Sequence, residues 1–268
     1  MREGNEEMST SDEVLVAVRE HVQYVTINRP ERRNALSLNV TASLVDAFAD
    51  AEENPDVWAV VLTGAGDKAF CAGADLKEFD EIAKSGKQIP VPMMGPRRNL
   101  YETVLETYKP TIAVLNGPAV AGGCELALAC DLRIAADHAA LGMPEAKRGM
   151  GANFATVVLP RLVPRAVALE MLYTGDNISA EDALKWGLYN LVVPGENLQE
   201  QAEKLVRRIV ANAPLTLRRY KEMLTKGWEL PVQSALRLNV GPNPYLTEDR
   251  QEGIRAYLEK RAPVWKGR

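Results

Sequence analysis

Cysteine and histidine are scarce in this sequence, which holds three of the first and two of the second among 268 residues. Cys71, Cys124 and Cys130 lie in apolar stretches and are too few for a disulfide framework, so we expect them to pack as small apolar residues. His21 and His138 stand far apart with no cysteine at ligand spacing, so we expect no metal site. Free thiols of this kind favour a reducing cytoplasm as the location of the protein.

Long apolar runs and an excess of positive charge are also missing. No apolar run reaches the ~18 residues that a membrane-spanning helix needs. The acidic start MREGNEEMSTS has neither the apolar core of a signal peptide nor the Arg-rich pattern of a transit peptide. A net charge of −4 argues against a nucleic-acid-binding surface. We therefore expect no membrane and no nucleic acid among the partners.

What is present is the composition of an ordinary globular protein, 46% hydrophobic and 25% charged. We expect a disordered N-terminal extension over residues 1–11, a core domain over 12–195 and a helical C-terminal subdomain over 196–268. Strands and helices alternate in the core, which predicts an α/β fold with parallel strands. Expected strands cover Val14–Arg19, Val22–Asn28, Trp58–Leu62, Thr111–Leu115, Leu132–Ala135 and Leu188–Val193, and expected helices cover Leu38–Glu53, Asp75–Lys84, Asn99–Tyr108, Ala166–Tyr173 and Ser179–Trp186.

One stretch, Asn116 to Glu145, is the centre of the functional argument. The buried strand before it is followed by Gly122 and Gly123 and then by the apolar helix CELALAC. A buried helix that begins at glycines presents unpaired N–H groups and the positive end of its dipole at that point. Both suit an oxygen atom that gains negative charge during a reaction.

Two carboxylates accompany this stretch. Glu125 lies in the first turn of the helix, and Glu145 follows after a second apolar strand. A first-turn glutamate is often present only because the helix dipole favours it. Here the segment is otherwise apolar, where an unpaired carboxylate would be costly. A second glycine turn, Cys71-Ala-Gly-Ala-Asp75, also follows a strand, so two turns can aim two N–H groups at one oxygen.

Three segments together resemble the enoyl-CoA hydratase/isomerase superfamily, the crotonases: AFCAGADLKEF (69–79), NGPAVAGGCELALACD (116–131) and GMPEAKRGM (142–150). They occur in the family's order and spacing, and three matched blocks are more specific than one. The resemblance extends from about Val14 to Arg268. It implies a crotonase-like spiral of repeated β-β-α units, with a helical C-terminal subdomain for trimerisation. The expected assembly is a homotrimer or a dimer of trimers.

The resemblance also implies the catalytic groups. Glu125 matches the glutamate that activates water for attack on the β-carbon of a 2-enoyl-CoA, and Glu145 matches the one that exchanges a proton with the α-carbon. The backbone N–H groups of Ala74 and Gly122 match the oxyanion hole for the thioester oxygen. Having both glutamates favours an enoyl-CoA hydratase that adds water reversibly. No cofactor is implied, because CoA is part of the substrate.

A larger set of residues is implied to contact the acyl-CoA. Its cations are candidates for the CoA phosphates, and each has solvated surface charge as its alternative interpretation. The last two cations would reach the CoA of a neighbouring subunit. The cations are Arg29, Arg32, Arg33, Lys77, Lys260 and Lys266, and the other expected contacts are Ala35, Ala72, Asp75, Leu76, Gly123, Asn153 and Phe154.

The sequence departs from common family hydratases over RGMGANFATVVLPRL (148–162). Asn153 and Phe154 stand where those hydratases have a glycine pair beside the acyl group. A ring and an amide there should reshape the pocket, so branched, aromatic or alicyclic acyl groups come into consideration. The segment Ser85–Pro96, rich in Pro, Gly and Met, is expected to be either a wall over the acyl pocket or a surface connector.

Other functions stay open at this point. An acyl-CoA double-bond isomerase or a carnitinyl-CoA-like dehydratase of the same superfamily fits several of the same segments. A serine protease of the Clp type shares the fold logic, but no Ser-His-Asp arrangement is evident. The non-enzyme alternative is an acyl-CoA-binding or RNA-binding relative, and the negative net charge argues against RNA.

Overall fold

The centre of the molecule is a six-stranded sheet. The computed structural model describes residues 12–87 and 98–268. The strand order is β1-β2-β3-β4-β6-β9, and only the β1–β2 pair is antiparallel. The strands are β1 (Val14–Arg19), β2 (Val22–Ile27), β3 (Ala59–Gly64), β4 (Thr111–Leu115), β6 (Leu132–Ala136) and β9 (Leu191–Val193). The predicted α/β class with parallel strands is therefore confirmed.

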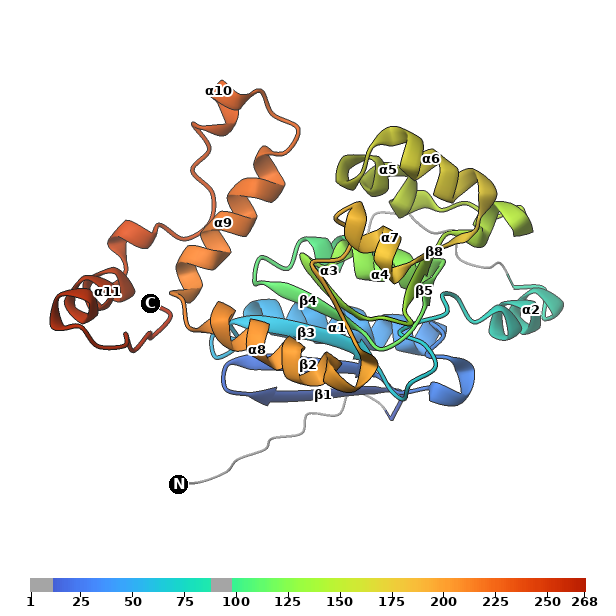
Figure 1. Ribbon diagram of the computed structural model, residues 1–268, viewed down its shortest axis with the longest axis horizontal. Coiled ribbons are helices and arrows are strands. Elements are labelled where there is room, and N and C mark those ends of the chain that lie inside the picture. Colours follow the sequence, from blue (N-terminus) through green and yellow to red (C-terminus); the bar gives the residue numbers. More distant parts are fainter. Residues whose placement is uncertain (1–11, 88–97) are drawn as a thin grey trace.

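Helices cover both faces of this sheet (Figure 1). On β3, Val60 and Leu62 point into the larger core, while Ala59 and Val61 point into the smaller one. The alternation arises because successive strand residues face opposite sides. Helices α1 (Leu38–Glu53), α3 (Leu100–Leu105) and α4 (Gly122–Ala129) pack in the larger core, and α8 (Leu198–Val210) covers the other face. A strand buried on both faces needs a continuous apolar run.

A second, three-stranded sheet lies beside the first. It is made of β5 (Ala119–Val120), β7 (Ala140–Gly142) and β8 (Asn177–Ser179), in the order β5-β7-β8. Two isolated bridges hold the loop after β3 to its neighbours: Ala74 pairs with Leu36, just before α1, and Cys71 pairs with Ala119 of β5. The loop after β3 and the start of α4 are thereby held side by side.

Local sequence signals explain several helix starts. The Ser37 side chain accepts a hydrogen bond from the Val40 N–H and caps α1, and Asn99 with Glu102 forms a capping box on α3. The predicted helix over Asn99–Tyr108 ends earlier, at Leu105, because the Tyr108 N–H donates to Glu52 Oε2 instead.

The last predicted strand of the core is also shorter than expected. It begins at Leu191, not Leu188, because the chain first makes a turn in which the Leu188 N–H donates to the Ala183 carbonyl. The Leu188 carbonyl in turn accepts a hydrogen bond from the Arg133 side chain. Residues 188–190 are therefore held by a turn, by the buried guanidinium and, at Asn190, by hydrogen bonds to the backbone of Arg133 in β6.

The C-terminal helices extend away from the sheet (Figure 1). They are α9 (Pro214–Gly227), α10 (Val232–Ala235) and α11 (Glu248–Glu259). Polar contacts hold α9 to the core: Lys221 Nζ lies 2.8 Å from Asp131 Oδ2, and Arg218 pairs with Glu52. Large apolar side chains of this region are exposed, namely Tyr220, Leu224, Leu236, Leu246, Tyr257 and Leu258.

Tyr189 gives a direct test of the packing. Its ring is 2% exposed, and its hydroxyl has no hydrogen-bond partner among the described residues. An unsatisfied buried polar group costs about 1–3 kcal/mol. We expect Tyr189→Phe to keep or raise the free energy of unfolding, by up to about 1 kcal/mol, in denaturant titrations. A marked loss of stability would show that this hydroxyl is satisfied after all.

Candidate active site

The two predicted glycine turns meet at the start of α4. A side chain added to Gly73 would come within 2.8 Å of the Ala121 Cβ and 3.0 Å of the Gly122 nitrogen. Gly73 itself has φ +84°, which favours glycine. Such close packing of one backbone on the other needs glycine at this position. The turn carrying Ala74 therefore lies directly against the turn carrying Gly122, as the sequence predicts.

The backbone at this junction leaves two donors free. Within the described chain, neither the Ala74 N–H nor the Gly122 N–H donates a hydrogen bond to another residue. Ala121, just before α4, has φ 54° and ψ −129°, which is a strained conformation for a residue with a side chain. Strain of this kind at a helix start is often found where the backbone must present its N–H groups to a ligand.

The other end of α4 is clamped by Arg133. Its guanidinium is buried and donates to the carbonyls of Ala127, Cys130 and Leu188. Helix C-terminal carbonyls carry partial negative charge and favour a cation. Arg133 thus fixes the position and orientation of the helix that bears Gly122 and Glu125.

Glu125 is 6% exposed and projects from the first turn of α4. Its Oε1 accepts a hydrogen bond of 2.9 Å from the Ala155 N–H. That N–H belongs to the first turn of α5 (Asn153–Leu162), whose own N-cap residue, Ala152, supplies no side-chain cap. The Glu125 carboxylate therefore serves as the cap of α5.

The Glu125 carboxyl titrates in the neutral range. Its pKa is raised to about 7: burial and then the Glu145 charge raise it, and the N–H groups of Ala155 and Phe154 and the Tyr101 hydroxyl oppose the rise. A carboxyl with a pKa near neutral pH can both take and give a proton during turnover.

Glu145 lies in a short 3-10 helix, Pro144–Arg148, and is 7% exposed. Its Oε2 is buried and has no hydrogen-bond partner among the described residues. Burial raises the pKa of this carboxyl, against the lowering effect of its own backbone N–H and of Arg148. An oxygen without a donor favours the protonated form.

The two carboxyls and Tyr101 form one cluster. The Glu145 charge acts on Glu125, and the charges of both act on Tyr101, whose pKa lies well above its usual value, first because of burial. The Tyr101 ring lies 5.5 Å from the Phe154 ring, tilted by 35°. Phe154 is buried and Asn153 is exposed. The Phe154 ring thus stands beside the carboxylates, while the Asn153 amide faces outward.

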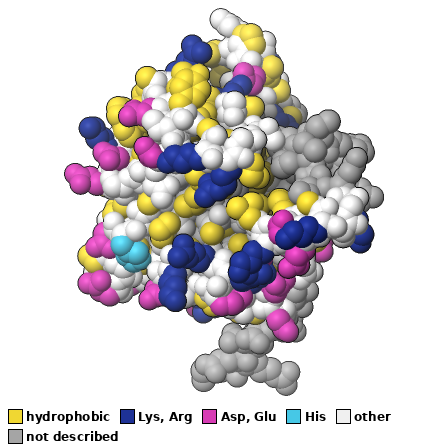
Figure 2. Space-filling view, turned by 90° about the vertical axis from the view of Figure 1, so that its right-hand side faces the viewer, with side chains coloured by type: hydrophobic (Ala, Val, Ile, Leu, Met, Phe, Trp, Pro, Cys, Tyr) yellow, Lys and Arg dark blue, Asp and Glu magenta, His cyan; other side chains and the backbone are white. Residues whose placement is uncertain are grey.

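The predicted cations divide into paired and exposed ones. Arg29 is largely buried, donates to the Ala35 carbonyl at 2.9 Å and pairs with Asp75 Oδ2 at 3.0 Å. Arg32 is half-buried, 3.8 Å from the same carboxylate. Arg33 and Lys77 are exposed. Figure 2 shows Lys and Arg side chains gathered around apolar ones on the face that carries α2 (Leu76–Lys84).

Other predicted contact residues have identifiable structural surroundings. Asp75 is buried and caps α2, with its pKa lowered by the Glu78 N–H and by Arg29 and Arg32 against the effect of burial. A side chain at Gly123 would meet the Cys71 carbonyl at 2.1 Å, so this glycine is needed for packing.

The remaining predicted positions surround or lie away from this cluster. Ala35 is buried, Ala72 is half-buried and Leu76 is exposed at the start of α2. Lys260 follows α11, and Lys266 Nζ lies 3.2 Å from Glu248 Oε2. Both lysines are on the C-terminal segment, away from the carboxylates of this protomer.

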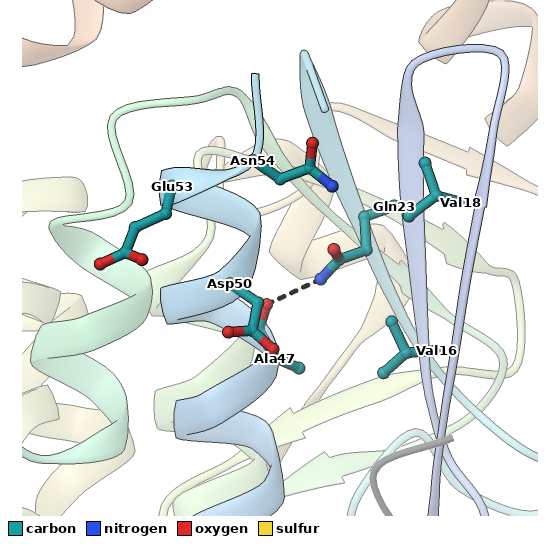
Figure 3. A pocket seen from close by; sticks show the side chains of 7 residues that line it. All are labelled: Val16, Val18, Gln23, Ala47, Asp50, Glu53 and Asn54. Atoms are coloured by element: carbon teal, nitrogen blue, oxygen red, sulfur yellow. Dashed lines mark hydrogen bonds between the residues drawn. The ribbon is translucent and has the colours of Figure 1, made fainter. Parts of the chain in front are cut away.

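Two cavities lie outside this cluster. One of about 300 Å³ is lined by Val16, Val18, Gln23, Ala47, Asp50, Glu53 and Asn54, and the Gln23 amide donates to the Ala47 carbonyl across it (Figure 3). The other lies between α9 and α11. The predicted acyl-pocket wall, Ser85–Pro96, falls mainly outside the described residues, as does the predicted extension over 1–11.

Sequence reasoning missed Tyr101 and Arg133. Neither belongs to a motif that carries chemistry by itself. The capping box at Asn99 could have placed Tyr101 in the first turn of a helix, but only the fold shows that α3 packs on α4. Among described residues, no group of three or more His, Cys, Asp or Glu side chains is placed to hold a metal ion, and no helix is long and apolar enough to cross a membrane.

The raised pKa of Glu125 predicts a pH-dependent stability. The folded protein keeps a proton between about pH 4.5 and 7 that the unfolded chain has released, so stability falls as pH rises through this window. Glu125→Gln removes that penalty. We expect it to raise the free energy of unfolding near pH 8, by at most about 3 kcal/mol, and much less near pH 5. The exposed Glu196→Gln is the matched control, and equal effects of both variants at the two pH values would contradict the prediction.

Comparison with known proteins is consistent with this geometry. The sequence profile described as enoyl-CoA hydratase/isomerase matches residues 17–268. An (E)-benzylidenesuccinyl-CoA hydratase of Thauera aromatica is 39% identical over 261 residues, covering 95% of this chain and 99% of the relative. A carnitinyl-CoA dehydratase of Salmonella typhi is 38% identical over 253 residues, covering 91% and 94%.

Solved structures agree as well. The crystal structure of an enoyl-CoA hydratase from Bacillus anthracis superposes with a TM-score of 0.86 at 36% identity, covering 96% of this chain and all of that one. An enoyl-CoA hydratase from Mycobacterium tuberculosis gives 0.85 at 35% identity, covering 96% and 100%. These similarities confirm the predicted crotonase-like fold.

Proposed function

Because the chain belongs to the enoyl-CoA hydratase/isomerase family, we propose that it adds water reversibly across the 2,3 double bond of a 2-enoyl-CoA thioester. The observation that carries the proposal is the buried pair Glu125 and Glu145 beside the backbone N–H groups of Ala74 and Gly122, which donate to no described residue. Two neighbouring carboxyl groups resist being ionised together, because their negative charges repel. Near neutral pH one is therefore protonated and can act as an acid, while the other is ionised and can act as a base.

The proposed step uses the pair in different roles. Glu125, which accepts from the Ala155 N–H, is the ionised base that takes a proton from water as the water oxygen bonds to C3. The π electrons move toward the thioester oxygen, whose charge the N–H groups of Ala74 and Gly122 stabilise. Glu145, whose buried Oε2 accepts from no residue in the described part of the chain, is the acid that gives its proton to C2. After the step Glu125 is protonated and Glu145 is ionised. Glu125 then loses its proton to solvent and Glu145 takes one up, which restores the starting protonation states.

Phe154 and Tyr101 favour an aromatic or branched acyl group. Their rings stand together beside the carboxylates. Aromatic walls pair with a ligand ring with ring centroids about 4.5–7 Å apart. One relative at 39% identity is named for a substrate that carries a benzylidene group. We therefore propose cinnamoyl-type thioesters as better substrates than short straight-chain ones.

Dehydration is the second candidate. The relatives named carnitinyl-CoA dehydratase match the chain nearly as well. The same acid and base run the reverse reaction when a 3-hydroxyacyl-CoA is supplied. Double-bond isomerisation, the other alternative, would move a proton from one carbon to another without water.

A turnover panel separates these functions. Purified protein is mixed with crotonyl-CoA, longer 2-enoyl-CoAs, cinnamoyl-CoA, a cyclohexenoyl-CoA and 3-hydroxyacyl-CoAs, and products are identified by mass. Reaction in ¹⁸O-labelled water places the label at C3 if hydration occurs. A shifted double bond without label would reassign the chain as an isomerase, and free CoA would indicate hydrolysis.

The exposed apolar side chains of α9 to α11 predict self-association. Monomeric proteins rarely expose a continuous patch of this kind. We propose a homotrimer, or a dimer of trimers, of the 29.5 kDa chain built through residues 196–268. Light scattering should give three or six times the chain mass, and Tyr257→Glu with Leu258→Glu should lower it. A monomer in the unsubstituted protein would refute the proposal.

A further inference from the structure

We propose that Tyr101 is a positioning residue for Glu125: its hydroxyl donates to the carboxylate and holds it toward the reacting carbons. The inference rests on the proposed hydration. It assigns a residue on α3, outside all three family-like segments, to the function of a glutamate on α4.

The hydroxyl is placed by contact with the start of α4. A Cβ built on Gly122 would lie 2.5 Å from the Tyr101 oxygen, closer than to any other atom. Gly122 and Glu125 are three residues apart on α4, so they share one face of the helix. A group that touches the Gly122 side of the helix is therefore within reach of the Glu125 side chain.

The ring has little freedom to move the hydroxyl elsewhere. Its centroid lies 5.5 Å from that of Phe154. The backbone of Tyr101 lies in the first turn of α3, which the Asn99–Glu102 capping box fixes, and Leu100 and Val104 on α3 are buried in the core. The hydroxyl is thus held in place before any substrate binds.

The charges around the hydroxyl keep it a donor. Burial raises the pKa of the phenol most, and the charges of Glu125 on α4 and Glu145 in the 3-10 helix raise it further. The third neighbouring group, the Cys71 thiol in the loop after β3, stays neutral because burial raises its own pKa to about 12. A phenol that stays protonated can only give its hydrogen bond to a neighbouring carboxylate. Glu125 is the carboxylate with which it interacts.

Glu125 is then held from two sides. Ala155 at the start of α5 donates to Oε1, and the proposed bond from the Tyr101 hydroxyl comes from α3, where this hydroxyl lowers the pKa of Glu125. Both donors favour the ionised form against burial and against the Glu145 charge. Since the proposed role of Glu125 is that of a base, removing one donor should raise its pKa and reduce its active fraction at neutral pH.

The test compares Tyr101→Phe with Tyr189→Phe. Each deletes one buried phenolic oxygen, but Tyr189 lies outside the site. We expect Tyr101→Phe to lower kcat/KM about tenfold at pH 7 and to move the ascending limb of its pH profile upward by about one unit, with KM little changed. Tyr189→Phe should keep the wild-type profile. A wild-type profile in Tyr101→Phe, or a drop equal at every pH, would overturn the inference.

A titration without substrate separates this inference from the proposed function. Infrared difference spectra between each protein and its Glu125→Gln counterpart isolate the Glu125 carboxyl. The pKa measured in this way should be about one unit higher in Tyr101→Phe than in wild type. If no thioester is hydrated but this shift is found, the proposed function fails and the positioning contact stands. If hydration occurs without the shift, only the inference is overturned.

Discussion

Glu125→Gln is expected to lower kcat for hydration by about 10²- to 10⁴-fold while leaving KM nearly unchanged. The amide keeps the shape of the side chain, and its oxygen can still accept from the Ala155 N–H. It cannot take a proton from water, so only the base is lost. Turnover is followed by the loss of absorbance of the conjugated thioester.

The control for this variant is Glu203→Gln on α8. That carboxylate lies on the opposite face of the sheet, where it accepts from the Tyr24 hydroxyl at 3.0 Å. The Glu203→Gln variant loses one negative charge, as Glu125→Gln does. Because residue 203 does not touch the site, this variant should keep full activity. If Glu125→Gln hydrates any of the substrates at the wild-type rate, the two-glutamate mechanism is refuted.

Gly122→Ala should have the second largest effect, a loss of about 10²- to 10³-fold in kcat. The new Cβ would lie 2.5 Å from the Tyr101 hydroxyl, so either the ring or the start of α4 must shift. A shift of α4 moves the Gly122 N–H away from the thioester oxygen. Losing one such donor typically costs about 3–4 kcal/mol of transition-state stabilisation.

A second substitution tests that reason. In Gly122→Ala with Tyr101→Phe the clashing oxygen is absent, and the next atom in line, Leu36 Cδ1, lies 3.6 Å from the added Cβ, an ordinary contact. We expect the double variant to be more active than Gly122→Ala alone, although Tyr101→Phe by itself lowers activity. If the loss of activity in the double variant equals the product of the losses in the two single variants, the clash with the Tyr101 hydroxyl is not the cause of the Gly122→Ala effect.

The sequence predicted the parts of the site that are local in the chain. Glycine turns, a first-turn glutamate and an apolar helix are visible within a few residues, so Gly122, Glu125 and the turn at Gly73 could be placed before the fold was known. The β-strands of the large sheet were predictable for a similar reason, because burial on both faces demands an apolar run.

Helix α5 could not be predicted in this way. Gly149 and Gly151 precede it, Pro160 lies inside it, and its N-cap residue has no side-chain oxygen. The group that caps it, Glu125, comes from 30 positions earlier in the chain. Likewise β5 and β8 are two and three residues long, too short to show a period of two.

The contact between Glu125 and α5 has a consequence for anyone who would redesign this protein. The first turn of α5 supplies both the Ala155 N–H that tunes the acidity of Glu125 and the Phe154 ring that stands beside it. Trimming Phe154 to admit a bulkier acyl group would also move the donor that sets the strength of the base. Under the proposed function we therefore expect substrate range and optimum pH to change together, so a library that varies one would have to be screened for both.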